Sequence, residues 1–150
     1  NHRMYFTTTP DFKTCAKAKL FYEDGFNVID STIIKHGTHY VMILKDETRY
    51  PPAKNLSMAF SDKVTGPWST ASKPFSPKGL WVEGPTCLQI GDSWVVYFDA
   101  YQKGKYAAMR SRDFKQWEDI SDQLKLPEGI RHGTAFPASK ELLIKLLSEK

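Results

Sequence analysis

The sequence has little cysteine and no long hydrophobic run. Its 150 residues include two cysteines, Cys15 and Cys87, which lack the spacing of metal ligands. We interpret both as small apolar core residues, with a disulfide as the alternative. No apolar stretch is long enough to cross a bilayer, so a membrane partner is not expected.

Concentrated charge is also lacking. Lys and Arg number 21 and Asp and Glu number 17, which gives a net charge of +4, and the two signs are interspersed. A nucleic-acid-binding surface needs a dense stripe of Lys and Arg, so nucleic acid is not expected as a partner. The sequence also lacks a glycine-rich phosphate loop, a Cys/His cluster and a Ser-His-Asp arrangement.

The composition is that of one globular domain over residues 1–150. Hydrophobic residues make up 41% and aromatic residues 13% of the chain, which excludes a disordered protein and allows a core of modest size. The chain begins at Asn1 rather than Met and carries no signal peptide. We therefore expect a processed or excised end, and the loss of a targeting segment stays open.

An internal repeat organises the sequence. Asp11-Phe12-Lys13 returns as Asp113-Phe114-Lys115, and Ser61-Asp62-Lys63 lies midway, 51 residues from each. In a second frame, the seven-position interval from Gly25 to Thr32 returns between Gly79 and Thr86. Periods of this length are typical of stacked units such as propeller blades.

Each unit has the alternating and branched pattern of β-strands, interrupted by turns at His36-Gly37 and Gly91-Asp92. A short fourth strand is expected near Phe75 and near Ile120, and Trp68 and Trp117 are expected to pack between neighbouring sheets. The other predicted strands are Val28–Ile34, Thr38–Leu44, Leu56–Phe60, Thr86–Ile90, Ser93–Tyr97 and Tyr106–Arg110.

The two ends look like incomplete units. Met4–Thr8 matches a third strand, and Gly129–Thr134 matches an inner strand. We therefore predict an all-β fold, a partial β-propeller of two complete four-stranded blades plus two half blades. A short C-terminal helix over Lys140–Ser148 would be capped by Ser139. A fragment without its N-terminal blades would expose strand edges, which favour self-association.

Ionisable residues in the inner strands are the candidate site, because inner strands of a propeller converge on its axis. They are Asp30, Glu83 and the pair Arg131-His132. The alternatives are a surface Glu83 at a strand edge and an Asp30 that bonds the following backbone. We interpret Asp46 and Glu47 as a solvated turn in a surface loop, and the Ser111–Trp117 segment as structural.

Three motifs in order resemble the later blades of glycoside hydrolase family 43, a family of five-bladed β-propellers. They are Phe26-Asn27-Val28-Ile29-Asp30-Ser31-Thr32, Trp81-Val82-Glu83-Gly84-Pro85-Thr86 and Pro127-Glu128-Gly129-Ile130-Arg131-His132-Gly133-Thr134. Lys45-Asp46-Glu47 and Ser111–Trp117 also fit, so the resemblance covers essentially the whole chain.

The resemblance implies an inverting glycosidase that acts on α-L-arabinofuranosides or β-D-xylosides of plant polysaccharides. In that design a base activates water, an acid protonates the leaving oxygen, and a further Asp adjusts the acid's pKa. Glu83 matches the general acid and Asp30 the pKa modulator. No residue matches the base, so we expect the chain to be inactive alone. A non-catalytic carbohydrate-binding propeller is the alternative, and an interaction scaffold without a sugar site is a third.

The resemblance further implies that Arg131 binds a sugar hydroxyl. Trp81 is either a sugar-stacking platform or a packing residue. His132 either holds a water or a metal ion, often a structural calcium in the central channel, or only hydrogen-bonds the backbone; no cofactor is required. An oligosaccharide or polysaccharide is the implied partner, and a secreted or bacterial periplasmic location is the expected one.

Overall fold

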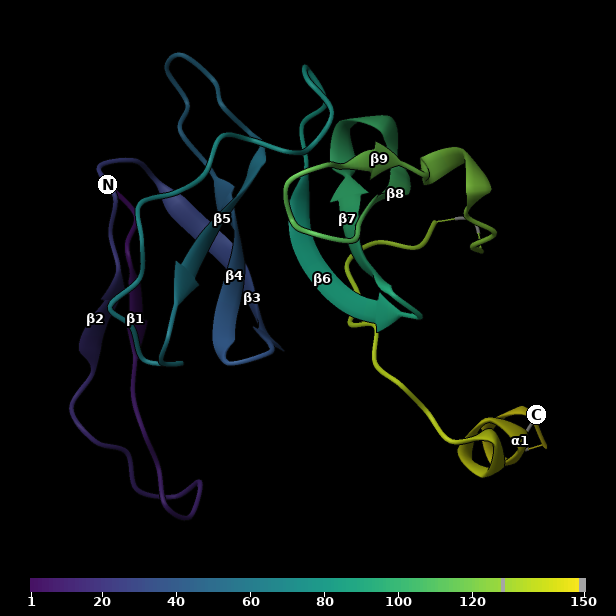
Figure 1. The fold of residues 1–150 in the computed structure, drawn as a ribbon, viewed down its shortest axis with the longest axis horizontal. Helices are drawn as coiled ribbons and strands as arrows, with labels where there is room; N and C mark the ends of the chain where they lie inside the picture. The colour runs from purple at the N-terminus through teal and green to yellow at the C-terminus, as the bar shows by residue number, and fades with distance from the viewer. Residues whose placement is uncertain (128, 149–150) are drawn as a thin grey trace.

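The computed structural model describes residues 1–127 and 129–148, which form three small antiparallel sheets and one helix (Figure 1). The first sheet pairs β1 (Met4–Phe6) with β2 (Lys19–Tyr22). The second contains β3 (Val28–His36), β4 (His39–Asp46) and β5 (Leu56–Ser61). The third contains β6 (Glu83–Ile90), β7 (Ser93–Ala100), β8 (Lys105–Ser111) and β9 (Glu118–Asp119).

The two predicted hairpins are confirmed, and both close in the same way. His36 pairs with His39 around Gly37, and Ile90 pairs with Ser93 around Gly91. Both glycines have a φ of 60°, a left-handed conformation that a residue with a Cβ adopts at a cost. The second and third sheets are therefore built on one pattern, as the repeat predicts.

The fourth strand predicted near Phe75 is wrong, because serine side chains take its place beside β5. The hydroxyls of Ser69, Ser72 and Ser76 each accept a β5 backbone N–H at 3.0 Å. Backbone N–H groups of this segment bond β5 carbonyls in return. The β5 edge is satisfied without a regular strand. In the third sheet, the strand predicted near Ile120 is confirmed as β9.

The inner strand predicted over Gly129–Thr134 is also wrong. Residues 129–134 have no strand pairing, and Glu128 lies outside the described residues. The segment is tied down by side chains instead, since Thr86 Oγ1 accepts the N–H of Ala135 at 3.1 Å and Tyr106 donates its hydroxyl to the Gly133 carbonyl at 3.4 Å. A strand needs a neighbouring strand to take up its backbone groups, and the described residues supply none here.

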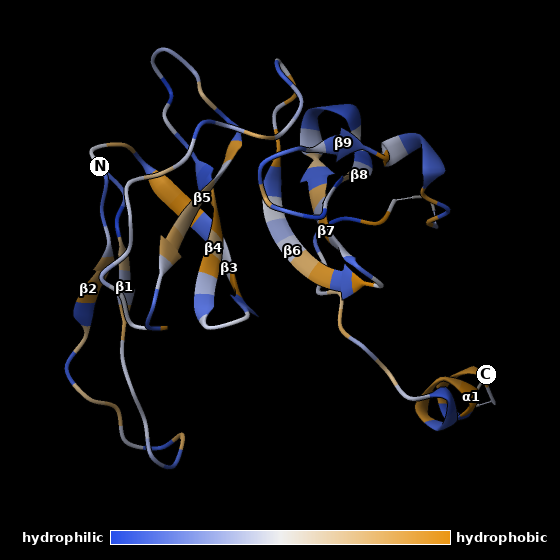
Figure 2. Ribbon diagram, in the orientation of Figure 1, coloured by the Kyte–Doolittle hydropathy of each residue, from blue (hydrophilic) through white to orange (hydrophobic). Residues whose placement is uncertain are grey.

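Two cores join the sheets face to face. One lies between the second and third sheets and includes Ile43, Leu56 and Phe98, all fully buried. The other joins the first and second sheets around Met42 and Leu44. Hydrophobic residues accordingly mark the strands in Figure 2. A closed ring of such sheets stays a prediction.

The two tryptophans pack between neighbouring sheets, as predicted. Trp117 stacks on Phe75 with ring centroids 4.1 Å apart, and Trp68 meets Phe21 edge-on at 5.7 Å. In each pair one ring comes from the segment after the third strand of its sheet. The aromatic contacts therefore add to the burial that joins sheet to sheet.

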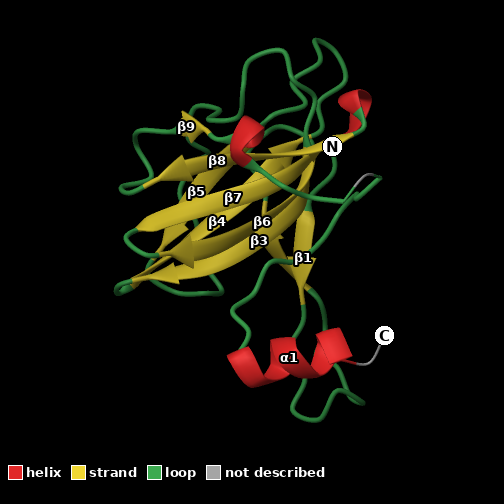
Figure 3. Ribbon diagram, turned by 90° about the vertical axis from the view of Figure 1, so that its right-hand side faces the viewer, coloured by secondary structure: helices red, strands yellow, loops and turns green. Residues whose placement is uncertain are grey.

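The predicted helix is confirmed as α1 (Lys140–Ser148), which lies apart from the sheets (Figures 1 and 3). Ser139 Oγ accepts the N–H of Leu142 at 3.1 Å, as expected of an N-cap. Its leucines are largely exposed. Among the described residues, no helix has the length and apolar character needed to span a membrane.

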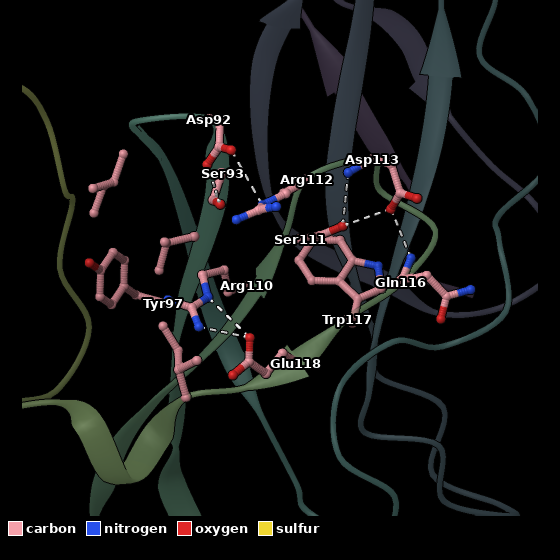
Figure 4. A pocket seen from close by; sticks show the side chains of 13 residues that line it. Asp92, Ser93, Tyr97, Arg110, Ser111, Arg112, Asp113, Gln116, Trp117 and Glu118 are labelled. Atoms are coloured by element: carbon pink, nitrogen blue, oxygen red, sulfur yellow. Dashed lines mark hydrogen bonds and ion pairs between the residues drawn. The ribbon is translucent and has the colours of Figure 1, made fainter.

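The segment from Ser111 to Trp117, which we interpret as structural, is held by hydrogen bonds among its own residues. Asp113 Oδ1 accepts the N–H of Gln116 at 2.9 Å (Figure 4). It also accepts the N–H of Lys115 at 2.8 Å. These backbone bonds hold the pKa of Asp113 below its usual range. The adjoining cleft of about 710 Å³ lies near Ser93, where β7 begins, whereas the candidate site lies where β7 ends.

Candidate functional site

The structure brings together two predicted acidic residues and the predicted histidine. Asp30 comes from β3, Glu83 from β6 and His132 from the segment before α1. One ligand atom of each lies within 4.8 Å of the others. A cleft of about 400 Å³ opens beside them, lined in part by Asp30, Gly84 and His132.

A shared backbone feature creates this convergence. Asp30, Gly84 and His132 each lie two residues before a threonine, and their φ values are 44°, 56° and 32°. Both β3 and β6 have an irregular register at this point, which is the local kink expected of a bulge. The kink turns the chain at the start of each strand toward its neighbour.

The pairing register shows which positions of the second and third sheets are equivalent. Ile29 pairs with Lys45 in the second sheet, and Glu83 pairs with Asp99 in the third. Glu83 is therefore equivalent to Ile29 and not to Asp30. Asp30 therefore corresponds to Gly84. Its Oδ2 accepts the Gly84 N–H at 3.0 Å, so Asp30 bonds the neighbouring sheet rather than the backbone that follows it.

Glu83 has a cationic or ionisable nitrogen at each carboxylate oxygen. Lys45 Nζ donates to Oε2 at 3.2 Å. Arg131 Nη2 lies 3.4 Å and His132 Nε2 lies 3.2 Å from Oε1. The Glu83 side chain is 22% exposed, so it is half-buried rather than a free surface group.

The interpretation of Glu47 as solvated is wrong. Its side chain is mostly buried and lies between two buried lysines. Lys45 Nζ lies 2.6 Å from Glu47 Oε2, and Lys54 Nζ forms a second ion pair with Oε1. Asp46 is half-buried as well. Charged residues usually lie on the surface, which is why the sequence pattern favoured a solvated turn.

These contacts set the ionisation of the network. Burial opposes the charge of Lys45, but its hydrogen bonds to Glu47 and Glu83 outweigh burial and raise its pKa. Burial likewise acts to raise the pKa of Glu47, and the two lysines outweigh it, so this pKa lies below its usual range. Both groups are therefore charged near neutral pH.

Asp99 is a fully buried carboxylate that the sequence analysis missed. Its Oδ2 accepts from Arg131 Nε at 2.5 Å and lies 3.8 Å from His132 Nε2. The sequence did contain a signal, which is a charged residue directly after an apolar run of a strand. Lys45 follows Val41–Leu44 in this way, and Asp99 follows Val95–Phe98. The two positions are equivalent in their sheets.

Arg131 and Trp81 lie at the edge of the same site. The Arg131 side chain is 55% exposed and bridges Asp99 and Glu83. Trp81 is half-buried, with its ring 6.3 Å from that of Tyr101 and 5.6 Å from Lys54 Nζ. Trp81 thus has packing partners, and a sugar-stacking role stays a prediction.

The three convergent groups offer two carboxylates and one imidazole nitrogen to a cation. Calcium in proteins takes six to eight oxygen ligands, so water would have to complete its shell. A cation here would also compete with Lys45 and Arg131 for Glu83. Calcium therefore stays a prediction.

Comparison with known families gives one result. A family model described as a probable glycosyl hydrolase domain, related to glycoside hydrolase family 43, matches residues 1–142. No curated protein matches the chain. The matched range includes Asp30, Glu83 and His132 and nearly the whole length of the chain. The chain therefore belongs to this family of probable glycosyl hydrolase domains.

Proposed function

We propose that the domain hydrolyses glycosidic bonds by inversion, as part of a β-propeller glycosidase, with Glu83 as the general acid. The observation that supports this most is the meeting of Asp30 and Glu83, from neighbouring sheets, beside an open cleft. An inverting glycosidase needs an acid at the leaving oxygen and a second carboxylate that activates water. Glu83 suits the first role because it is half-buried and lies next to Asp30 and His132, which line the cleft.

In this proposal Glu83 donates its proton to the leaving oxygen while water adds to the anomeric carbon and a base takes the water's proton. Asp30 takes the place of the second aspartate of this design, and it holds the segment that carries Glu83 by accepting the Gly84 N–H at 3.0 Å. We assign no base within this chain and expect the base from another part of the enzyme.

The substrate we propose is an α-L-arabinofuranoside or β-D-xyloside side chain of a plant polysaccharide. Arg131 would bind a sugar hydroxyl, since it is half exposed beside Glu83 and anchored by Asp99. A calcium ion would be held by His132 and the two carboxylates. We further propose a secreted or periplasmic location, and self-association through the sheet edges and faces that have no partner sheet.

The proposal is tested by Glu83→Gln. General acid catalysis contributes roughly 10²- to 10⁴-fold, so in the enzyme that includes the base, hydrolysis of alkyl arabinofuranosides or xylosides should fall by at least about 100-fold. Alkyl leaving groups are chosen because they depend most on an acid. Glu118→Gln is the matched control, since Glu118 is exposed at the opposite end of the third sheet. Unchanged activity in Glu83→Gln would remove the acid role.

A non-catalytic carbohydrate-binding domain is the second candidate. One observation favours it: both Glu83 oxygens contact positive or protonatable nitrogens, and a carboxylate held in this way is well placed to accept hydrogen bonds from sugar hydroxyls. Calorimetry separates the two functions. Affinity for arabinose or xylose oligosaccharides without any turnover would favour the binding domain.

A further inference from the structure

A second cleft, of about 800 Å³, lies where β3 begins and β4 ends. Asn27 lines it on one side, and the loop between β4 and β5 lines the other with Asp46, Arg49 and Tyr50. That loop lies at the upper edge of Figure 1. The lining combines an aromatic ring with donors and acceptors of both signs, which is the kind of surface that binds a small polar ligand.

The loop that carries Tyr50 is held in place by its own backbone. Thr48 donates its N–H to Asp46 Oδ1 at 2.8 Å and accepts the N–H of Ala53 at 3.1 Å. Arg49 and Pro52 form an isolated bridge across the tip. Tyr50 nevertheless leaves 91% of its surface exposed. An aromatic ring on an ordered loop offers a ligand a contact at a low cost in conformational entropy.

The cleft adjoins the Glu83 site. Glu47 donates its backbone N–H to the Asn27 carbonyl at 2.7 Å, and its carboxylate shares Lys45 Nζ with Glu83. Asn27 directly precedes β3 and lies three residues before Asp30, so their Cα atoms lie at most about 11 Å apart. A short oligosaccharide can therefore contact both clefts at once.

We propose that this cleft is a second carbohydrate-binding site, which binds sugar units of the same oligosaccharide beyond the one beside Glu83. The Tyr50 ring packs against the apolar face of a neutral sugar, and Arg49 and Asp46 hydrogen-bond its hydroxyls. A neutral sugar suits the cleft because its lining offers both acidic acceptors, Asp46 and Glu47, and a basic donor, Arg49. The proposal rests on the proposed function for the identity of the ligand.

The test compares ligand length in calorimetric titrations of the protein with xylose and with xylo-oligosaccharides or arabinoxylo-oligosaccharides. Tyr50→Ala should weaken oligosaccharide binding about tenfold, the effect of about 1.4 kcal/mol, and leave monosaccharide binding unchanged. Phe12→Ala is the matched control, because Phe12 is equally exposed, at 95%, on the β1–β2 turn at the lower edge of Figure 1. It should change neither affinity.

Three results overturn the inference: an unchanged oligosaccharide affinity in Tyr50→Ala, an equal loss for the monosaccharide, or no affinity for either sugar. The proposed function fails separately. If Glu83→Gln leaves hydrolysis intact while Tyr50→Ala weakens oligosaccharide binding, the acid role is lost and the second site stands. If only Glu83→Gln has its expected effect, the acid role stands and the second site is lost.

Discussion

The second and third sheets have the same backbone arrangement but different residues at their equivalent site positions. In each sheet the first strand has the same kink near its start. Beside the kink, one residue of the first strand pairs with one residue of the second strand. In the second sheet the pair is Ile29 and Lys45, and in the third it is Glu83 and Asp99. Lys45 and Asp99 are both fully buried and opposite in charge.

This difference explains why the site lies between sheets. Two carboxylates directly opposite each other on neighbouring strands repel, so Glu83 and Asp99 would destabilise an isolated third sheet. Lys45 of the second sheet bonds Glu83, and Arg131 bonds Asp99. Three segments therefore complete a charge network that none of them could hold alone.

The largest expected effect on this comparison comes from Lys45→Met. The substitution keeps the buried stem but removes the cation that Glu47 and Glu83 share, and removing one partner of a buried ion pair costs roughly 3–5 kcal/mol. The measurement is the free energy of unfolding in urea. Lys35→Met on the exposed edge of β3 is the control and should change it by less than about 0.5 kcal/mol. A cost for Lys45→Met no larger than that of the control would show that the network does not depend on this lysine.

The site residues that interrupt an apolar segment could be predicted from the sequence. The site residues whose burial depends on contacts between sheets could not. Asp30 and Glu83 are acidic residues that interrupt apolar segments near the start of their units, and that signal located them. Lys45, Glu47 and Asp99 sit among residues that look equally compatible with a surface turn or a strand end. Their burial follows from contacts between sheets, about which the period of a single strand carries no information.

The elements of the fold that depend on local signals could likewise be predicted, and those that depend on contacts with another strand could not. Hairpins at Gly37 and Gly91 were predictable because their glycines and alternation are local signals. The segment beside β5 was not, since Ser69, Ser72 and Ser76 replace strand pairing with hydroxyl bonds. A serine looks the same in sequence whether it faces water or completes a sheet edge.

A smaller effect is expected from Gly84→Ala, which tests the shared kink. Gly84 has a φ of 56°, and a Cβ there would lie 2.7 Å from His132 Cδ2. Left-handed backbone costs an alanine roughly 1–2 kcal/mol, and the contact would push His132 away from Glu83. Asp30 occupies the equivalent position with a φ of 44°, a conformation that aspartate tolerates better than most residues.

Gly79→Ala is the control that separates strain from contact. Gly79 also has a positive φ, 79°, but a Cβ there meets nothing within 4 Å. Both variants should lose similar stability in urea unfolding, and only Gly84→Ala should alter the NMR resonances of His132. An identical His132 spectrum in the two variants would mean that the imidazole does not lie against Gly84.

The smallest effect is a pH dependence that belongs to Glu47. Burial acts to raise its pKa, but Lys45 and Lys54 lower it below the ordinary value of 4.5. A carboxyl with a lowered pKa stabilises the fold above its unfolded pKa, and this stability is lost as the pH falls through the folded value. Glu47→Gln should therefore be less stable than the wild type at pH 7, and the difference should shrink below about pH 4 as wild-type Glu47 takes up a proton. Urea unfolding at pH 7 and pH 3 measures it. If the difference in the free energy of unfolding is the same at pH 7 and pH 3, Glu47 does not form the ion pairs with Lys45 and Lys54. Lys45 would then pair with Glu83 alone.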